Sequence, residues 1–181
     1  MTLPPPADGE AHPWKTILKV LAILAGYSAA LMAACVAVHI RQLNTQGPDA
    51  QASAGMYAFG DGMLFVEVFG GLALLPTGLG LYYLRPVRIF WTFLAVAAMP
   101  LAATGPVSAV VVALASKVPD PPSFWQVGTA FGVLRMLGSP LLAASFLLGG
   151  CLAPTRFPRW TFLGTTLIEA GVSAYAIFHC S

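Results

Sequence analysis

The chain has 181 residues, of which 57% are hydrophobic and only 9% are charged, and its formal net charge is +2. An average soluble domain contains roughly 25% charged residues, so this composition excludes an ordinary water-soluble surface. The nine Lys and Arg residues are spread along the chain without forming a run, which argues against nucleic-acid binding. We therefore expect most of the protein surface to face lipid.

The polar N-terminal segment, residues 1–16, is rich in proline and predicts a cytoplasmic tail, so that residues 17–181 form the membrane-embedded part. A competing interpretation makes the first apolar segment a cleaved signal, because Met32-Ala33-Ala34-Cys35 loosely resembles a bacterial lipobox. Methionine stands where leucine is usual, and the apolar residues continue to Ile40. We therefore favour a retained helix.

Five apolar runs are long enough to cross a bilayer, which takes about 20 residues of helix. They cover residues 17–40, 62–84, 89–115, 126–152 and 160–179. Backbone polar groups cannot stay unpaired in hydrocarbon, so each run should be helical. The sequence predicts an all-α, polytopic transmembrane helical bundle of about five spans. Prolines inside the runs should kink it, at Pro76, Pro100, Pro106 and Pro140.

Basic residues fix the expected orientation. Six lie on one predicted side, namely Lys15, Lys19, Arg85, Arg88, Arg156 and Arg159, and two, Arg41 and Lys117, lie on the other. The positive-inside rule then predicts an N-in/C-out protein. Short loops together with this bias favour a bacterial inner (cytoplasmic) membrane. The four tryptophans fall at span ends and are expected at the headgroup level: Trp14, Trp91, Trp125 and Trp160.

Small residues at four-residue spacing predict close helix contacts. Gly128 and Gly132 form a GxxxG motif, and Gly149 follows Ser145 at the same spacing. In the first span, Ala29, Ala33 and Ala37 predict a similar face.

A short internal similarity suggests a repeated hairpin. The sequence Trp91-Thr92-Phe93-Leu94 recurs as Trp160-Thr161-Phe162-Leu163. Parallel repeats of this kind occur in transporters. The alternative is that Trp and Arg recur at each cytoplasmic turn.

Two of the three charges inside the apolar runs have matching predicted depth. Glu67 lies seventeen residues before Leu84, and Arg135 lies seventeen before Leu152, so each should be about 26 Å from the inner boundary. We expect Glu67 and Arg135 to form a charge pair or to line an outward-facing vestibule, because ionisable residues in a bilayer need a partner or water.

The third charge, Glu169, lies nine residues into its predicted span, about 14 Å deep and close to the midplane. No basic residue matches that depth, so burial should favour the neutral acid. Tyr27, Ser28 and Ser145 are the expected hydrogen-bond partners. Such a carboxyl either carries protons or holds helices together.

Histidine and cysteine give no clear site. His39 and His179 sit near the outer span ends and could ligate a metal or haem, but no ligand spacing supports this, so no metal is expected. Cysteines are odd in number and far apart, and a Cys35–Cys180 bridge stays open. Binding of pigment or quinone also stays open.

Two functions from different classes fit these features. We favour a non-catalytic subunit or scaffold of a larger membrane assembly, which contacts the lipid bilayer and other membrane-protein subunits or a second copy. The chain lacks P-loop, HExxH and GxSxG motifs, and its loops are short. The alternative is a small proton- or ion-coupled carrier for a polar solute that uses the midplane carboxyl Glu169.

Overall fold

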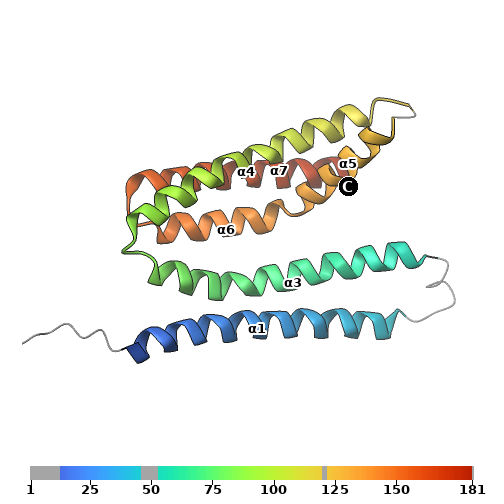
Figure 1. The fold of residues 1–181 in the computed structure, drawn as a ribbon. Coiled ribbons are helices and arrows are strands. Elements are labelled where there is room, and N and C mark those ends of the chain that lie inside the picture. The colour runs from blue at the N-terminus through green and yellow to red at the C-terminus, as the bar shows by residue number, and fades with distance from the viewer. Residues whose placement is uncertain (1–12, 46–52, 120–121, 181) are drawn as a thin grey trace, which may run out of the picture. The chain divides into compact units, whose positions relative to one another are not determined.

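The all-α prediction is confirmed by a computed structural model, which describes residues 13–45, 53–119 and 122–180. Its helices are α1 (Pro13–Asn44), α3 (Ala54–Tyr83), α4 (Arg88–Ala115), α5 (Ser123–Leu137), α6 (Ser139–Leu152) and α7 (Arg156–Cys180) (Figure 1). Within those described ranges there are helices and short turns, and no strand. Most of the predicted tail, residues 1–12, lies outside them.

The span count also agrees with expectation. Four helices are long and apolar enough to cross a membrane alone, and α5 and α6 pass the same test together. Counting that bent pair as one span gives five transmembrane segments. The protein is therefore a polytopic membrane protein.

Three helices begin at least four residues earlier than predicted. α1 begins at Pro13, α3 at Ala54 and α7 at Arg156, four to eight residues before the apolar runs. Proline suits the first turn of a helix, because its missing N–H would have no helical acceptor there. An apolar run marks only the part of a helix inside hydrocarbon, so the difference is expected wherever a helix continues into the headgroup region.

The predicted break at Pro140 is confirmed. α5 ends at Leu137 and α6 begins at Ser139, with a bend of 47° between their axes. Pro140 stands in the first turn of α6 and has no N–H to bond the carbonyl four residues earlier. The fourth span is consequently two short helices joined at Gly138.

The chain divides into two compact units, residues 1–76 and residues 77–181. In unit 1, α1 and the first part of α3 approach closely at Gly26, where an added Cβ would lie 2.9 Å from Cβ of Pro76. The buried alanines of α1 are Ala30 and Ala34. The predicted alanine face was therefore misplaced by one residue, and Ala29 is exposed.

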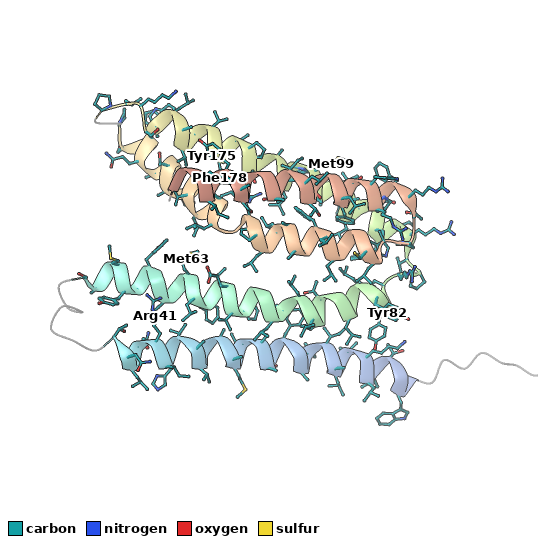
Figure 2. The ribbon with its side chains drawn as sticks, turned by 180° about the vertical axis from the view of Figure 1, so that it is seen from behind. Arg41, Met63, Tyr82, Met99, Tyr175 and Phe178 are labelled. Atoms are coloured by element: carbon teal, nitrogen blue, oxygen red, sulfur yellow. The ribbon has the colours of Figure 1, made fainter. Side chains whose placement is uncertain are left out.

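One polar contact ties the two helices of unit 1 together. Nε of Arg41 on α1 lies 3.6 Å from Oδ1 of Asp61 on α3, and Nε2 of Gln42 donates a hydrogen bond of 2.9 Å to Oδ2. Figure 2 shows Arg41 on the side of α1 that faces α3. The guanidinium covers Gly60, where an added Cβ would collide with it. A side chain at this position would therefore make the guanidinium of Arg41 shift.

Unit 2 is held by small residues of α4 against aromatic rings of α6 and α7. The buried core consists of Trp91, Ala95, Ala98, Ala102, Phe146, Ala153 and Phe162. The alanines recur every three or four residues, so they form one face of α4, and their size lets neighbouring helices approach. Trp91 is fully buried and donates from Nε1 to the carbonyl of Leu84 at 3.1 Å. Trp91 thus faces the protein interior near the start of α4, and its predicted headgroup depth stays a prediction.

The hairpin repeat is not reflected in the packing. Trp91 is fully buried, whereas Trp160 is 71% exposed; Phe93 is 78% exposed, whereas Phe162 is 2% exposed. Residues that correspond in sequence thus occupy opposite environments. Trp91 and Phe162 instead pack edge to face, with ring centroids 6.3 Å apart. The packing therefore gives no support to a repeated hairpin.

Candidate functional site

The most distinctive polar feature of unit 2 is an ion pair between α5 and α7. Glu169 on α7 has no exposed surface, and Arg135 lies in the last turn of α5 with 16% of its side chain exposed. Nη2 of Arg135 lies 2.5 Å from Oε1, and Nη1 lies 3.1 Å from Oε2. This two-pronged geometry matches the planar guanidinium to the carboxylate and is the strongest form of the contact.

The remaining donors of Arg135 are satisfied by neighbouring helices. Nε donates to Oγ1 of Thr104 on α4 at 2.8 Å, and Nη1 donates to Oγ of Ser139 at the start of α6 at 3.1 Å. Nη2 also donates to the carbonyl of Leu101 at 3.0 Å. A guanidinium has five N–H groups, and all five are now accounted for. Arg135 on α5 therefore connects its own helix to α4, α6 and α7.

A glycine on α4 makes room for this arrangement. An added Cβ at Gly105 would lie 3.1 Å from Cγ2 of Val172, 3.5 Å from Nη2 of Arg135 and 3.6 Å from Oε2 of Glu169. Pro100 and Pro106 bracket the segment that carries Leu101, Thr104 and Gly105. The absence of a side chain at Gly105 keeps α4 close to α7 beside the pair.

The prediction that Glu169 has no basic partner is wrong. The prediction that Arg135 pairs with Glu67 is also wrong, because every N–H donor of the Arg135 side chain is used inside unit 2. Both errors come from depth. α7 begins at Arg156, so Glu169 lies about 20 Å from the helix start rather than about 14 Å. The bend between α5 and α6 shortens the projected depth of Arg135, and its long side chain covers the rest.

Of the hydrogen-bonding residues expected around Glu169, Ser145 instead donates its hydroxyl to the carbonyl of Leu141 at 2.8 Å. Tyr27 and Ser28 belong to unit 1, so their pairing with Glu169 stays a prediction. Two residues that were not expected, Thr104 and Ser139, complete the site by accepting from Arg135. Their only signal in the sequence was their proximity to Pro106 and Pro140, because a hydroxyl alone does not reveal its partner.

Glu67 behaves differently from Glu169. It lies on an exposed part of α3, six residues or about 9 Å along the helix from Asp61. Among the described residues of unit 1, none donates a hydrogen bond to its carboxylate. An ionisable side chain inside a membrane span normally has a partner or water. Glu67 is therefore a charged group without a partner among the described residues of unit 1.

The predicted packing glycines lie at helix contacts. An added Cβ at Gly132 would lie 3.0 Å from Cγ2 of Val112 on α4, and one at Gly149 would lie 3.3 Å from the ring of Phe162 on α7. At Gly128 the nearest atom, Cγ1 of Val111, is 3.9 Å away. Gly132 and Gly149 thus permit the closer approaches.

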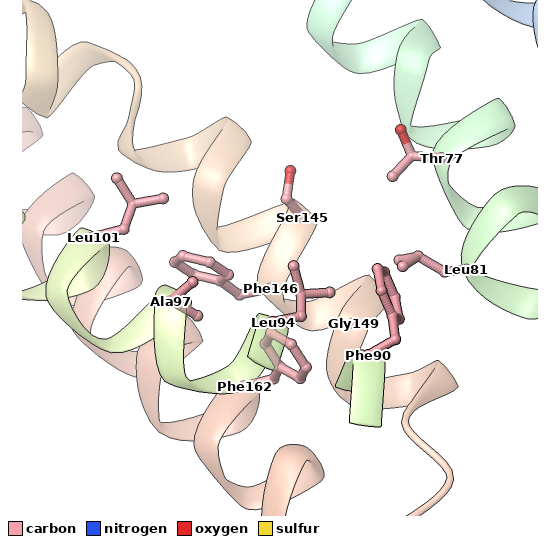
Figure 3. A pocket seen from close by; sticks show the side chains of 11 residues that line it. Thr77, Leu81, Phe90, Leu94, Ala97, Leu101, Ser145, Phe146, Gly149 and Phe162 are labelled. Atoms are coloured by element: carbon pink, nitrogen blue, oxygen red, sulfur yellow. The ribbon is translucent and has the colours of Figure 1, made fainter. Parts of the chain in front are cut away.

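An apolar cavity of about 270 Å³ lies beside the core of unit 2. Figure 3 shows Phe146 and Phe162 on one side, and Thr77 and Leu81, from the end of α3, on the other, with Phe90 beside Leu81. Its lining is almost wholly apolar, with the hydroxyls of Thr77 and Ser145 as the polar groups among those that line it. Such a cavity suits an apolar group rather than a polar solute.

Metal and thiol chemistry have little support in the described part of the chain. Among those residues no group of three or more His, Cys, Asp or Glu side chains could hold a metal. His39 is exposed on α1, and the side chain of His179 lies outside the described set. Cys35 and Cys151 are free and exposed, which argues against the Cys35–Cys180 bridge.

Comparison with protein-family models, with curated proteins and with solved structures gave no match for this chain. Arginine stays protonated in proteins, so the charge of Glu169 is compensated permanently and nearby. The arrangement can fix helices relative to one another. It offers no nucleophile next to a base.

Proposed function

We propose that the protein is a non-catalytic subunit or scaffold of a larger membrane assembly, held N-in/C-out in a bacterial inner membrane. The observation that carries this proposal is the contrast between the interior charges. Arg135 and Glu169 satisfy each other within the chain, whereas Glu67 is exposed and unpaired within its unit. A membrane-embedded carboxylate of that kind needs a donor from elsewhere.

The expected partner is a transmembrane helix that carries a basic or hydrogen-bond-donating side chain at the depth of Glu67. Hydrogen bonds between transmembrane helices contribute about 1 kcal/mol each, so they select a register more than they drive association. The large apolar exposure of the helices leaves ample surface for helix packing. Glu67 would then set which face of α3 meets the partner.

The proposed orientation and location rest on the distribution of arginines. Arg85 and Arg88 flank the turn from α3 to α4, and Arg156 and Arg159 open α7. These two turns lie at the same end of unit 2 (Figure 1). The positive-inside rule assigns that end to the cytoplasm.

The alternative, a proton- or ion-coupled carrier, is no longer supported. It required a carboxyl near the midplane without a basic partner, and Glu169 makes two contacts with Arg135. A carrier would now have to break that pair in every cycle. We therefore retain the subunit proposal alone.

Native mass measurement after mild-detergent extraction from the source membrane tests the proposal. The wild-type chain should be found with a stoichiometric partner, and Glu67→Gln should reduce recovery of that complex severalfold. Asp61→Asn is the matched control, because it removes a carboxylate of the same helix that already has partners in Arg41 and Gln42. We expect it to keep the complex.

Two outcomes would overturn the proposal. One is a wild-type chain that is always isolated, with no partner and no second copy. The other is a Glu67→Gln protein that unfolds more easily as a monomer yet assembles normally, since Glu67 would then be serving its own chain.

A further inference from the structure

A groove between α6 and α7 opens at the arginine-rich end of unit 2. It has a volume of about 360 Å³ and is lined by Gly150, Cys151, Arg159 and Leu163. Gly150 contributes no side chain to it, and Leu163 lies close by, with its Cδ2 3.5 Å from where a Cβ of Gly150 would be. The groove thus combines apolar walls with one guanidinium.

The guanidinium of Arg159 is held by one hydrogen bond, and most of its N–H donors make no hydrogen bond to the described residues. Nη2 donates a hydrogen bond of 3.1 Å to the carbonyl of Ala153 in the turn before α7. Its other N–H groups have no acceptor among the described residues. Arg135, by contrast, uses all five donors. Arg159 is therefore held beside the groove with free donors for an acceptor from outside the chain.

Three further arginines add positive charge at the same end. Arg85, Arg88 and Arg156 are exposed, and no described residue accepts a hydrogen bond from their side chains. Each basic residue near a membrane surface contributes about 1 kcal/mol to attraction of anionic lipid. Basic pockets between transmembrane helices on the cytoplasmic side are a known setting for anionic headgroups.

We infer that this groove binds an anionic phospholipid, with the headgroup phosphate on Arg159 and one acyl chain along Gly150 and Leu163. The bilayer surrounds the groove, so such a lipid is always at hand. A zwitterionic lipid has the same chains but carries a cation that the nearby arginines would repel. The inference does not depend on whether the chain is a subunit.

Native mass spectrometry of the purified protein with added phosphatidylglycerol or phosphatidylcholine tests this assignment. We expect preferential retention of phosphatidylglycerol by the wild type. Arg159→Gln should weaken that retention by at least about fivefold, the factor that corresponds to about 1 kcal/mol. Lys117→Gln removes one positive charge beyond the other end of α4 and should change it less than twofold. Equal retention of both lipids, or equal effects of the two variants, would overturn the inference.

Thiol labelling of the wild-type protein gives a readout that needs no substitution. Cys151 borders the groove, and Cys35 on α1 is a second free thiol that serves as an internal control. Phosphatidylglycerol should slow alkylation of Cys151 relative to Cys35 severalfold, and inorganic phosphate should not. Equal protection by inorganic phosphate would show a free-anion site and refute a lipid site, and unchanged labelling in phosphatidylglycerol would refute both.

Discussion

Among the residues that the structure describes, each unit contains one interhelical Arg–carboxylate pair, and the two pairs differ in burial and in their contacts. In unit 2, Arg135 meets Glu169 through two contacts, and the side chains are 16% and 0% exposed. In unit 1, Nε of Arg41 meets Asp61 at 3.6 Å, and the side chains are 35% and 18% exposed. The buried pair is surrounded by additional hydrogen-bond partners from α4 and α6, whereas the exposed pair is open to its surroundings.

The difference in burial determines how much each ion pair contributes to the stability of the fold. Two buried charges lose hydration, so their pairing must be complete, and removing one partner leaves the other uncompensated. An exposed pair is screened and exchanges readily with water or headgroups, so it contributes little. We therefore expect unit 2 to depend on its pair and unit 1 to depend on apolar packing at positions such as Gly26.

The largest effect is expected from Arg135→Met, which leaves the carboxylate of Glu169 buried without its cation. Losing one member of a buried pair costs about 3–5 kcal/mol. The free energy of unfolding, measured by reversible denaturation in mixed micelles, should fall by that amount.

The double variant Arg135→Met/Glu169→Leu is the matched control, because it removes both charges and keeps apolar volume. Replacing a buried pair in this way is often neutral. We expect most of the lost stability to return. Additive losses from the two substitutions would show that the side chains do not interact.

A smaller effect is expected at Gly105. Alanine there would place its Cβ 3.1 Å from Val172, so α4 and α7 must move apart beside the ion pair. Crowding of this kind typically costs about 1–3 kcal/mol in the free energy of unfolding. The same denaturation assay should detect it.

Gly164→Ala on α7 is the control for Gly105→Ala, since an added Cβ there meets nothing within 4 Å. Alanine is the better helix former, so stability should stay equal or rise by up to about 1 kcal/mol. If both variants lose equal stability, close approach at Gly105 is not the cause.

The smallest effect is expected from the exposed pair of unit 1. A double-mutant cycle with Arg41→Gln and Asp61→Asn should give a coupling energy of about 0.2–1 kcal/mol, as exposed pairs do. Added salt should reduce it further. A coupling as large as that of Arg135 and Glu169 would remove the distinction between the two units.

Much of the fold was predictable from the sequence, because the apolar runs and prolines act locally. The runs identified five spans, and Pro140 marked the break between α5 and α6. Helix starts such as Arg156 were missed, since helices extend beyond the hydrocarbon. The small-residue face of α4 was also missed, although Ala95, Ala98 and Ala102 have helical spacing.

The site was predictable only in part. Charge inside the apolar runs singled out Arg135 and Glu169, which pair with each other, and Glu67, whose role stays a prediction. Their pairing depended on a bend of 47° and a four-residue shift in the start of α7, neither of which can be read from depth along straight helices. Thr104 and Ser139 could not be predicted for a related reason, since their role as hydrogen-bond acceptors depends on where the side chain of Arg135 lies.

The Arg135–Glu169 pair lies inside one unit of the chain, whereas we propose that Glu67 faces a partner. Native mass measurement of the extracted assembly from cells that carry either Arg135→Met/Glu169→Leu or Glu67→Gln tests it most directly. We predict that the double variant, once shown to be folded, keeps the complex and that Glu67→Gln loses most of it. A folded double variant without the complex, beside an intact complex in Glu67→Gln, would contradict the account.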